Sequence, residues 1–177
     1  MNNRTTSLVI RRIKAFAIDY LTILIYIGLL TGITVLISNL FDTRPGKIST
    51  VTAELIGFFT LTLPVILYFA ISEAGPHAGT IGKQKFGLKV VSVSPATAGF
   101  PRLLLRNLIK FLPWEIAHFF IYQLFYYIRT EDPPPGWVVA GLINAQVLAL
   151  VYLLFILFHK DNRSLYEIAS GTRVVNK

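Results

Sequence analysis

The 177-residue sequence contains no cysteine, and only nine of its side chains are acidic. The lack of cysteine excludes disulfides, thiolate-bound zinc, iron–sulfur clusters and thiol catalysis. Charged residues make up only 15% of the chain, whereas 54% of its residues are hydrophobic. This balance lies well outside that of a soluble domain of similar size. The composition therefore predicts an integral membrane protein.

Four apolar stretches approach the roughly 20 residues that a helix needs to cross about 30 Å of hydrocarbon. They cover residues 15–37, 55–71, 111–128 and 137–158. With four crossings, the two termini and the central loop share one side of the membrane. All Lys and Arg residues lie on that side except Arg44, Lys47 and Arg129. By the positive-inside rule, we expect both termini and the central loop to be cytoplasmic.

The formal net charge of +8 has a simple source in this topology. The bases flank the ends of the predicted spans, where they fix orientation and meet anionic lipid headgroups. Membrane lipids are therefore the expected partners of the basic face, and a nucleic-acid partner is not expected.

Two twelve-residue segments resemble each other, and each follows a pair of predicted spans. They are TIGKQKFGLKVV, within residues 80–91, and SLYEIASGTRVV, within residues 164–175. Both begin with a hydroxyl residue and carry glycine at the eighth position, a base at the tenth, and then Val-Val. This repeat predicts an all-α membrane fold of two parallel hairpin-plus-motif halves, in a single domain over residues 1–177.

Each motif predicts a short cytoplasmic amphipathic helix followed by an extended segment. Ser164 and Glu167 have the spacing of a capping box, which satisfies free amides in the first helical turn. Gly87 and Gly171 stand where such a helix would end. The strand-prone residues that follow are expected to pair with each other. Lys83 and Glu167 occupy equivalent places with opposite charge, so we expect them to meet across the pseudo-twofold axis.

Four motifs in order resemble the RDD family of small bacterial and archaeal membrane proteins: RRIKAFAIDYL, TIGKQKFGLKVV, RNLIKFLPWEIAH and SLYEIASGTRVV. The family is named for one arginine and two aspartates. The first two look like Arg12 and Asp19, and Glu167 stands where the second aspartate is usual. The resemblance implies a multi-pass protein of the bacterial cytoplasmic (inner) membrane with a proposed transport role.

Asp19 lies one turn inside the first predicted span, where an ionised carboxylate costs several kcal/mol. As a functional group, it would be a proton or cation site reached from the cytoplasm, with Arg12 at its mouth. As a structural group, it would be the buried partner of Arg106 or Lys110 and would fix the packing of the first and third spans. Both interpretations remain open from the sequence.

Glu115 and His118 are one turn apart on the third predicted span. They could relay protons, or they could form a hydrogen-bonded pair that anchors this span to Asn144 or Gln146. A bound metal is not expected, because the second E-x-x-H motif of a carboxylate-bridged di-metal site is absent. Glu73, at the cytoplasmic end of the second span, is expected to be reached by solvent.

The hypothesis from these residues is transport of a small solute or cation, coupled to protons through Asp19 and the Glu115 and His118 cluster. Arg106 and Lys110 would complete the binding residues. No catalytic triad or similar set is recognised, so neither an enzyme nor a cofactor is expected.

Four helices make a thin wall for a pathway, so a transporting form is expected to be a homodimer or a larger assembly. Gly28, Gly32 and Gly57 would allow close approach between helices. One alternative is a non-transporting membrane module that organises lipid or a partner protein, with the buried charges holding the helices in place. Another is a small-ligand or lipid pocket between the hairpins.

Overall fold

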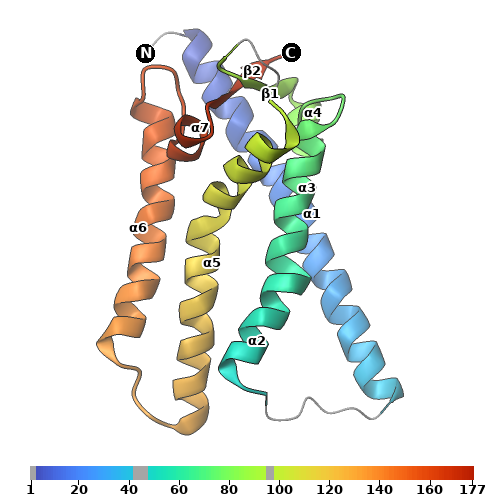
Figure 1. Ribbon diagram of the computed structural model, residues 1–177, viewed down its shortest axis with the longest axis vertical. Helices are drawn as coiled ribbons and strands as arrows, with labels where there is room; N and C mark the ends of the chain where they lie inside the picture. The colour runs from blue at the N-terminus through green and yellow to red at the C-terminus, as the bar shows by residue number, and fades with distance from the viewer. Residues whose placement is uncertain (1–2, 42–47, 95–97) are drawn as a thin grey trace.

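The computed structural model describes residues 3–41, 48–94 and 98–177, and it is mostly helical (Figure 1). Long helical segments follow its longest axis: α1 (Asn3–Leu40), the continuous run α2 (Thr50–Gly57), η1 (Phe58–Thr62) and α3 (Leu63–Ala74), then α5 (Phe100–Thr130) and α6 (Gly136–Phe158). The shorter elements are α4 (Ile81–Lys85), β1 (Leu88–Ser92), α7 (Leu165–Ala169) and β2 (Thr172–Asn176). These short elements gather at one end of the molecule, where α1 also begins (Figure 1).

Within the described residues, three helical segments are long and apolar enough to cross a membrane. They are Leu8–Leu40, Thr50–Ala74 and Gly136–Phe158. The helix α5 has sufficient length, at 31 residues, but polar side chains such as Glu115 and His118 keep it below the hydropathy of the other three. The prediction of a helical membrane protein is confirmed at this level. A fourth crossing by α5 remains a prediction, and the predicted outer-side residues Arg44 and Lys47 lie outside the described residues.

The outer surface of the long helices is apolar. In the candidate span of α1, only 6% of the most apolar 18-residue segment is buried inside the molecule. Side chains such as Leu29 and Ile33 are exposed. The second half of α1 diverges from α2 (Figure 1). Since lipid rather than water can cover such a surface at no cost, this pattern fits a bilayer environment.

The two motifs fold locally as their sequences predict. Thr80 caps α4 by accepting a hydrogen bond from the Lys83 amide, and Ser164 and Glu167 form the expected capping box on α7. Gly87 and Gly171 follow these helices with φ of +64° and +60°, a conformation that costs glycine least. The local elements of both motifs are therefore confirmed.

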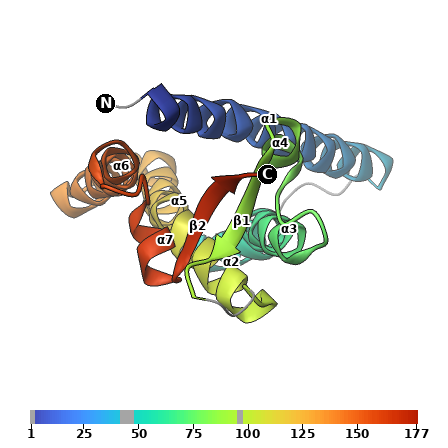
Figure 2. The ribbon, with the colours of Figure 1, turned by 90° about the horizontal axis from the view of Figure 1, so that it is seen from above.

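The strands β1 and β2 pair in the antiparallel direction, as expected. Val90 lies opposite Val174 in this register, and these two residues hold the same place in the two motifs. Viewed from this end, the strands lie across the helices with α7 on one side and α4 on the other (Figure 2). The two motifs are therefore related by a local twofold axis that passes through the sheet.

The sheet covers a small apolar core. Leu88, Val90 and Val174 from the strands pack with Ala15 of α1 and Leu103 of α5. A second apolar cluster joins α1, α3 and α5: it contains Ile23, Val65, Ile66, Phe69 and Phe111. The first cluster fixes where α1, α5 and both strands meet, and the polar residues of the candidate site lie around that meeting point.

Candidate functional site

Arg106 is the centre of a buried charge network. Its side chain is 1% exposed and its Nε donates to Glu73 Oε2 at 3.1 Å. Its Nη1 lies 3.4 Å from Glu167 Oε1 and donates to Thr172 Oγ1 at 3.0 Å. The side chains of Glu73 and Glu167 are fully buried. One arginine on α5 thus joins a carboxylate on α3 to a carboxylate on α7.

Two further bases extend the network at either end. Lys83 on α4 donates from Nζ to Glu73 Oε1 at 3.0 Å. Arg12 on α1 binds Glu167 Oε2 and the carbonyl of Asn162. The charge network is therefore the alternating series Lys83, Glu73, Arg106, Glu167 and Arg12, which links five helices.

This arrangement changes the expected role of two residues. The expected contact between Lys83 and Glu167 is not formed. Lys83 pairs with Glu73, and Arg106 pairs with both Glu73 and Glu167, so it separates the two residues. Glu73 is not solvated either, since the residue is only 2% exposed. Its sequence signal is the spacing of Ile66, Phe69 and Glu73, which places all three on one face of α3 and toward the core.

Each charged group of the network has an oppositely charged partner within the network. A buried carboxylate or guanidinium is stable only when opposite charge and hydrogen bonds replace the lost water. Glu73 accepts hydrogen bonds from Lys83, Arg106 and Asn107. Glu167 Oε2 accepts from Arg12 and the Ser164 amide, whereas Glu167 Oε1 accepts no hydrogen bond from any described residue and is balanced by the charge of Arg106 at 3.4 Å. The contacts therefore fix the relative positions of the helices that carry them.

Electrostatics within the network favour the charged forms. Burial raises the pKa of Glu167, but Arg106, Arg12 and the Ser164 amide together hold that pKa below its usual value of 4.5. Burial lowers the pKa of Arg106, whereas Glu73 and Glu167 hold it above its ordinary range. Both groups are consequently ionised near neutral pH.

The lowered pKa of Glu167 predicts an acid-dependent loss of stability. Such a carboxylate contributes fully above its unfolded pKa, near 4.5, and the contribution disappears as pH falls through the lower folded value. We expect the thermal unfolding temperature of the wild type to fall more steeply below about pH 4.5 than that of Glu167→Gln. Circular dichroism of the detergent-solubilised protein across this range measures both slopes.

The control for this experiment is Glu131→Gln, because Glu131 is exposed at the end of α5. It should keep the wild-type slope. Parallel slopes for wild type and Glu167→Gln would show that Glu167 is not the titrating group.

Asp19 is buried, with 1% of the residue exposed, but it has no ion pair with Arg106 or Lys110 among the described residues. It accepts hydrogen bonds from Thr80 Oγ1 at 2.6 Å and from the Gly82 amide at 2.9 Å. The predicted partners were wrong because the first turn of α4 supplies both donors. Lys110 instead lies 3.5 Å from the centre of the Phe69 ring.

The contact between Asp19 and α4 depends on a glycine. A Cβ atom placed on Gly82 would overlap the carbonyl of Ala15 and approach Asp19 Cγ to 2.9 Å. Glycine therefore lets the backbones of α4 and α1 touch. Asp19 is a cap for the first turn of α4, joining α1 to the first motif.

Glu115 and His118 form a second, separate polar group on α5. Glu115 Oε2 lies 3.8 Å from His118 Nδ1, and their side chains are 28% and 22% exposed. Thr62 Oγ1 lies 3.5 Å from the same His118 nitrogen. The pair faces η1, not Asn144 or Gln146, which are exposed on α6. The alternative of an anchor to α6 was therefore wrong.

This second group lies beside a π-helical turn. Phe58–Thr62 forms η1, and such turns are frequent at functional sites. Glu54 on α2 and Tyr122 on α5 lie within electrostatic reach of Glu115. The Glu115 Oε2 atom is buried and accepts no hydrogen bond from any described residue. The sequence analysis missed Glu54, for which the available signal is its position directly before the apolar stretch 55–71.

The structure also locates the remaining predicted groups. Gly28 and Gly32 have open space beside them, but Gly57 does not, because Tyr122 packs against it. Gly57 is therefore not available for contact with another chain. Across the described residues, no group of three or more His, Asp or Glu side chains could hold a metal ion.

A comparison with protein families gives one match over nearly the whole chain. The sequence model described as RDD family matches residues 6–171. No curated protein and no solved structure is significantly similar to the chain.

Proposed function

The chain belongs to the RDD family, and from this premise and the site geometry we propose that it transports a small solute or cation across a membrane, coupled to protons. The observation that carries the proposal is the unbonded Glu115 Oε2 near His118 on α5. An ionisable pair in an apolar helix is costly and is a functional candidate by default. Glu167 Oε1 also accepts no hydrogen bond from the described part of the chain, but it pairs with the permanently charged Arg106. Among the described residues, the ion-pair partner of Glu115 is instead an imidazole, so this pair can exchange a proton or cation.

The same proposal reassigns Asp19. Both of its oxygens are occupied by Thr80 and Gly82, so it serves transport only by holding α4 on α1. The proton-handling groups are Glu115 and His118, with Glu54 and Tyr122 beside them.

The proposed topology has four crossings, by α1, by α2 through α3, by α5 and by α6. The sheet end faces the cytoplasm of a bacterium, because the basic residues concentrate there. Anionic lipid headgroups cover this basic face. In this proposal the transporting form is a homodimer or a larger assembly, and the open surface beside Gly28 and Gly32 allows helices of neighbouring copies to approach closely.

A pH-sensitive dye in proteoliposomes tests transport. The wild type is challenged in turn with Na⁺, K⁺, Li⁺ and small organic solutes, beside folded Glu115→Gln and Asp19→Asn. We expect solute- or cation-dependent proton flux in the wild type and its loss in Glu115→Gln. The matched control is Glu131→Gln, which removes a carboxylate from the exposed end of the same helix and should keep the flux.

One observation favours the second candidate, a non-transporting module that organises lipid or a partner protein. The charge network fixes five helices at the basic end, which suits a rigid platform more than a moving part. Absence of flux in the wild type under every challenge would favour this candidate. Binding to vesicles containing anionic lipid would then be the activity to measure.

A further inference from the structure

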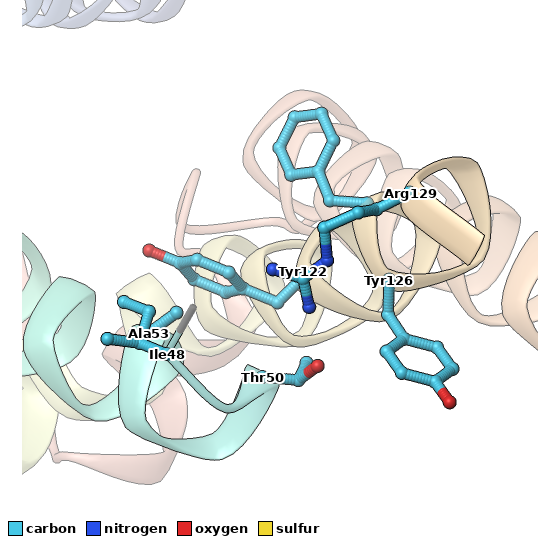
Figure 3. Close-up of a pocket in the computed structure, with 7 residues that line it drawn as sticks. Ile48, Thr50, Ala53, Tyr122, Tyr126 and Arg129 are labelled. Atoms are coloured by element: carbon cyan, nitrogen blue, oxygen red, sulfur yellow. The ribbon is translucent and has the colours of Figure 1, made fainter. Parts of the chain in front are cut away.

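A small cavity lies at the end of the molecule opposite the sheet. Its volume is about 140 Å³, and it lies between the first turn of α2 and the last turns of α5 (Figure 3). The lining residues are Ile48, Thr50, Ala53, Tyr122, Phe125, Tyr126 and Arg129. The cavity is thus aromatic and aliphatic on most sides, with a few polar groups.

Arg129 is the only ionisable lining residue that is charged near neutral pH. Its guanidinium extends into the cavity beside Tyr122, on the side that faces Thr50, whereas the Tyr126 hydroxyl points away (Figure 3). Within the described part of the chain, Arg129 forms no salt bridge. A guanidinium beside a hydroxyl can hold a carboxylate through two parallel hydrogen bonds.

The size and walls of the cavity limit the rest of the ligand. A cavity of about 150 Å³ accommodates a molecule the size of benzene. The rings of Tyr122 and Phe125 and the side chain of Ile48 offer apolar surface to such a body. A flat ligand of this size with one anionic group matches both features.

We propose that this cavity binds a small organic carboxylate with a compact apolar body. The ligand carboxylate pairs with Arg129 and Thr50, and its apolar part packs against Tyr122 and Phe125. This inference rests on the proposed transport function, for which it names the class of solute and the point of entry.

Tyr122 connects the cavity with the proton-handling group. It lines the cavity, and its hydroxyl packs against Gly57, one turn after Glu54 in the same continuous helix. On α5, Tyr122 follows His118 by four residues, so the two share one face of the helix. A bound carboxylate adds negative charge to a region that already contains Glu54 and Glu115. Uptake of a proton in this region therefore favours binding of the carboxylate, and by linkage binding favours uptake of a proton to the same extent. Ligand and proton are thus bound together.

Isothermal titration of the purified full chain with benzoate tests the site. Benzamide has the same shape without the charge, so it should bind at least about tenfold more weakly. Arg129→Gln should weaken benzoate binding by about the same factor. The matched control is Arg173→Gln, which changes an exposed arginine on β2 at the opposite end of the molecule, and this variant should bind benzoate as the wild type does.

Titrations in two buffers of different ionisation enthalpy test the coupling. We expect benzoate binding to take up protons in the wild type and to take up fewer in Glu115→Gln, while affinity for benzoate persists in that variant. Absence of benzoate binding to the wild type would overturn the inference. Equal affinity for benzoate in wild type and Arg129→Gln, or equal affinity of the wild type for benzamide, would also overturn it.

The same experiment separates this inference from the proposed function. Benzoate binding that depends on Arg129, without proton flux in proteoliposomes, would keep the site and reject transport. Proton flux driven by cations, without benzoate binding, would keep transport and reject the carboxylate site.

Discussion

Arg106→Met is expected to lower the free energy of unfolding by about 3–5 kcal/mol, because it leaves two buried carboxylates without their shared base. Glu73 would retain Lys83, and Glu167 would retain Arg12, but the charge between them would be gone. Methionine fills much of the space of the arginine, so the loss measures charge more than volume. Reversible unfolding in mixed detergent micelles, followed by circular dichroism, gives the difference.

The matched control for Arg106→Met is Arg102→Met, one turn earlier on α5. Arg102 is partly exposed, and among the described residues its side chain donates only to the hydroxyls of Ser92 and Ser94. Its replacement should cost less than about 1 kcal/mol, as expected for a partly solvated interaction. Equal losses from the two substitutions would contradict a special role for Arg106.

A combined variant separates charge from packing at the same site. Adding Glu73→Gln and Glu167→Gln to Arg106→Met removes the uncompensated carboxylates, so the triple variant should recover more than half of the lost stability. Replacing a whole buried ion network by neutral groups is often nearly neutral, whereas removing one member is costly. A triple variant as unstable as Arg106→Met would point to packing instead.

The local structure of this chain follows from short sequence patterns. Ser164 and Glu167 are three residues apart, so their capping box needs only each other and the backbone between them. Gly87 and Gly171 end their helices for the same local reason. Pairing between β1 and β2 also follows, because the two strand-prone segments are equivalent and were expected on the same side of the membrane.

The partners of the buried charges could not be predicted in the same way. Asp19 and Arg106 lie on different long helices and are far apart in the sequence. Matching opposite charges alone therefore pairs them with each other. In the structure, α4 approaches α1 closely enough for Gly82 and Thr80 to take both Asp19 oxygens. Arg106 is then left to Glu73 and Glu167. Such choices depend on distances between helices, which periodicity and charge do not specify.

The charged residues of this protein fall into two groups, one that stabilises the fold and one that is available to bind a ligand. The charged residues of the buried network and Asp19 each have partners within the chain, so changing them should act first on stability. Glu115 and Arg129, in contrast, lack an ion pair with a strong partner among the described residues, and their replacement should leave folding nearly intact. Proposals about transport are therefore best tested with Glu115 and Arg129, and proposals about folding with Arg106 and Gly82.

Gly82→Ala is the second substitution with a large expected effect. The added Cβ would overlap the Ala15 carbonyl, and this backbone atom cannot move aside as a flexible side chain could. The helix α4 must retreat from α1, which also breaks the Gly82 hydrogen bond to Asp19 and leaves the carboxylate buried. We expect a loss of about 3 kcal/mol from overpacking and the unsatisfied acceptor together.

Gly136→Ala is the control for Gly82→Ala. A Cβ on Gly136 meets nothing within 4 Å, and alanine favours a helix over glycine, so stability should stay the same or rise slightly. Hydrogen exchange followed by mass spectrometry locates the effect. The amides of α4 and of β1 should exchange faster in Gly82→Ala and remain protected in Gly136→Ala.

Asp19→Asn provides the independent check on that contact. Asparagine keeps the size of the side chain but loses the charge, and its amide group presents a donor where Thr80 and Gly82 both require an acceptor. If Asp19 is the cap of α4, this variant should show the same fast-exchanging segment as Gly82→Ala, while benzoate binding at the far end of the molecule is kept. If Asp19→Asn leaves α4 protected and instead abolishes proton flux in a protein that is otherwise fully stable, the capping role is wrong and the carboxylate belongs to the transport site.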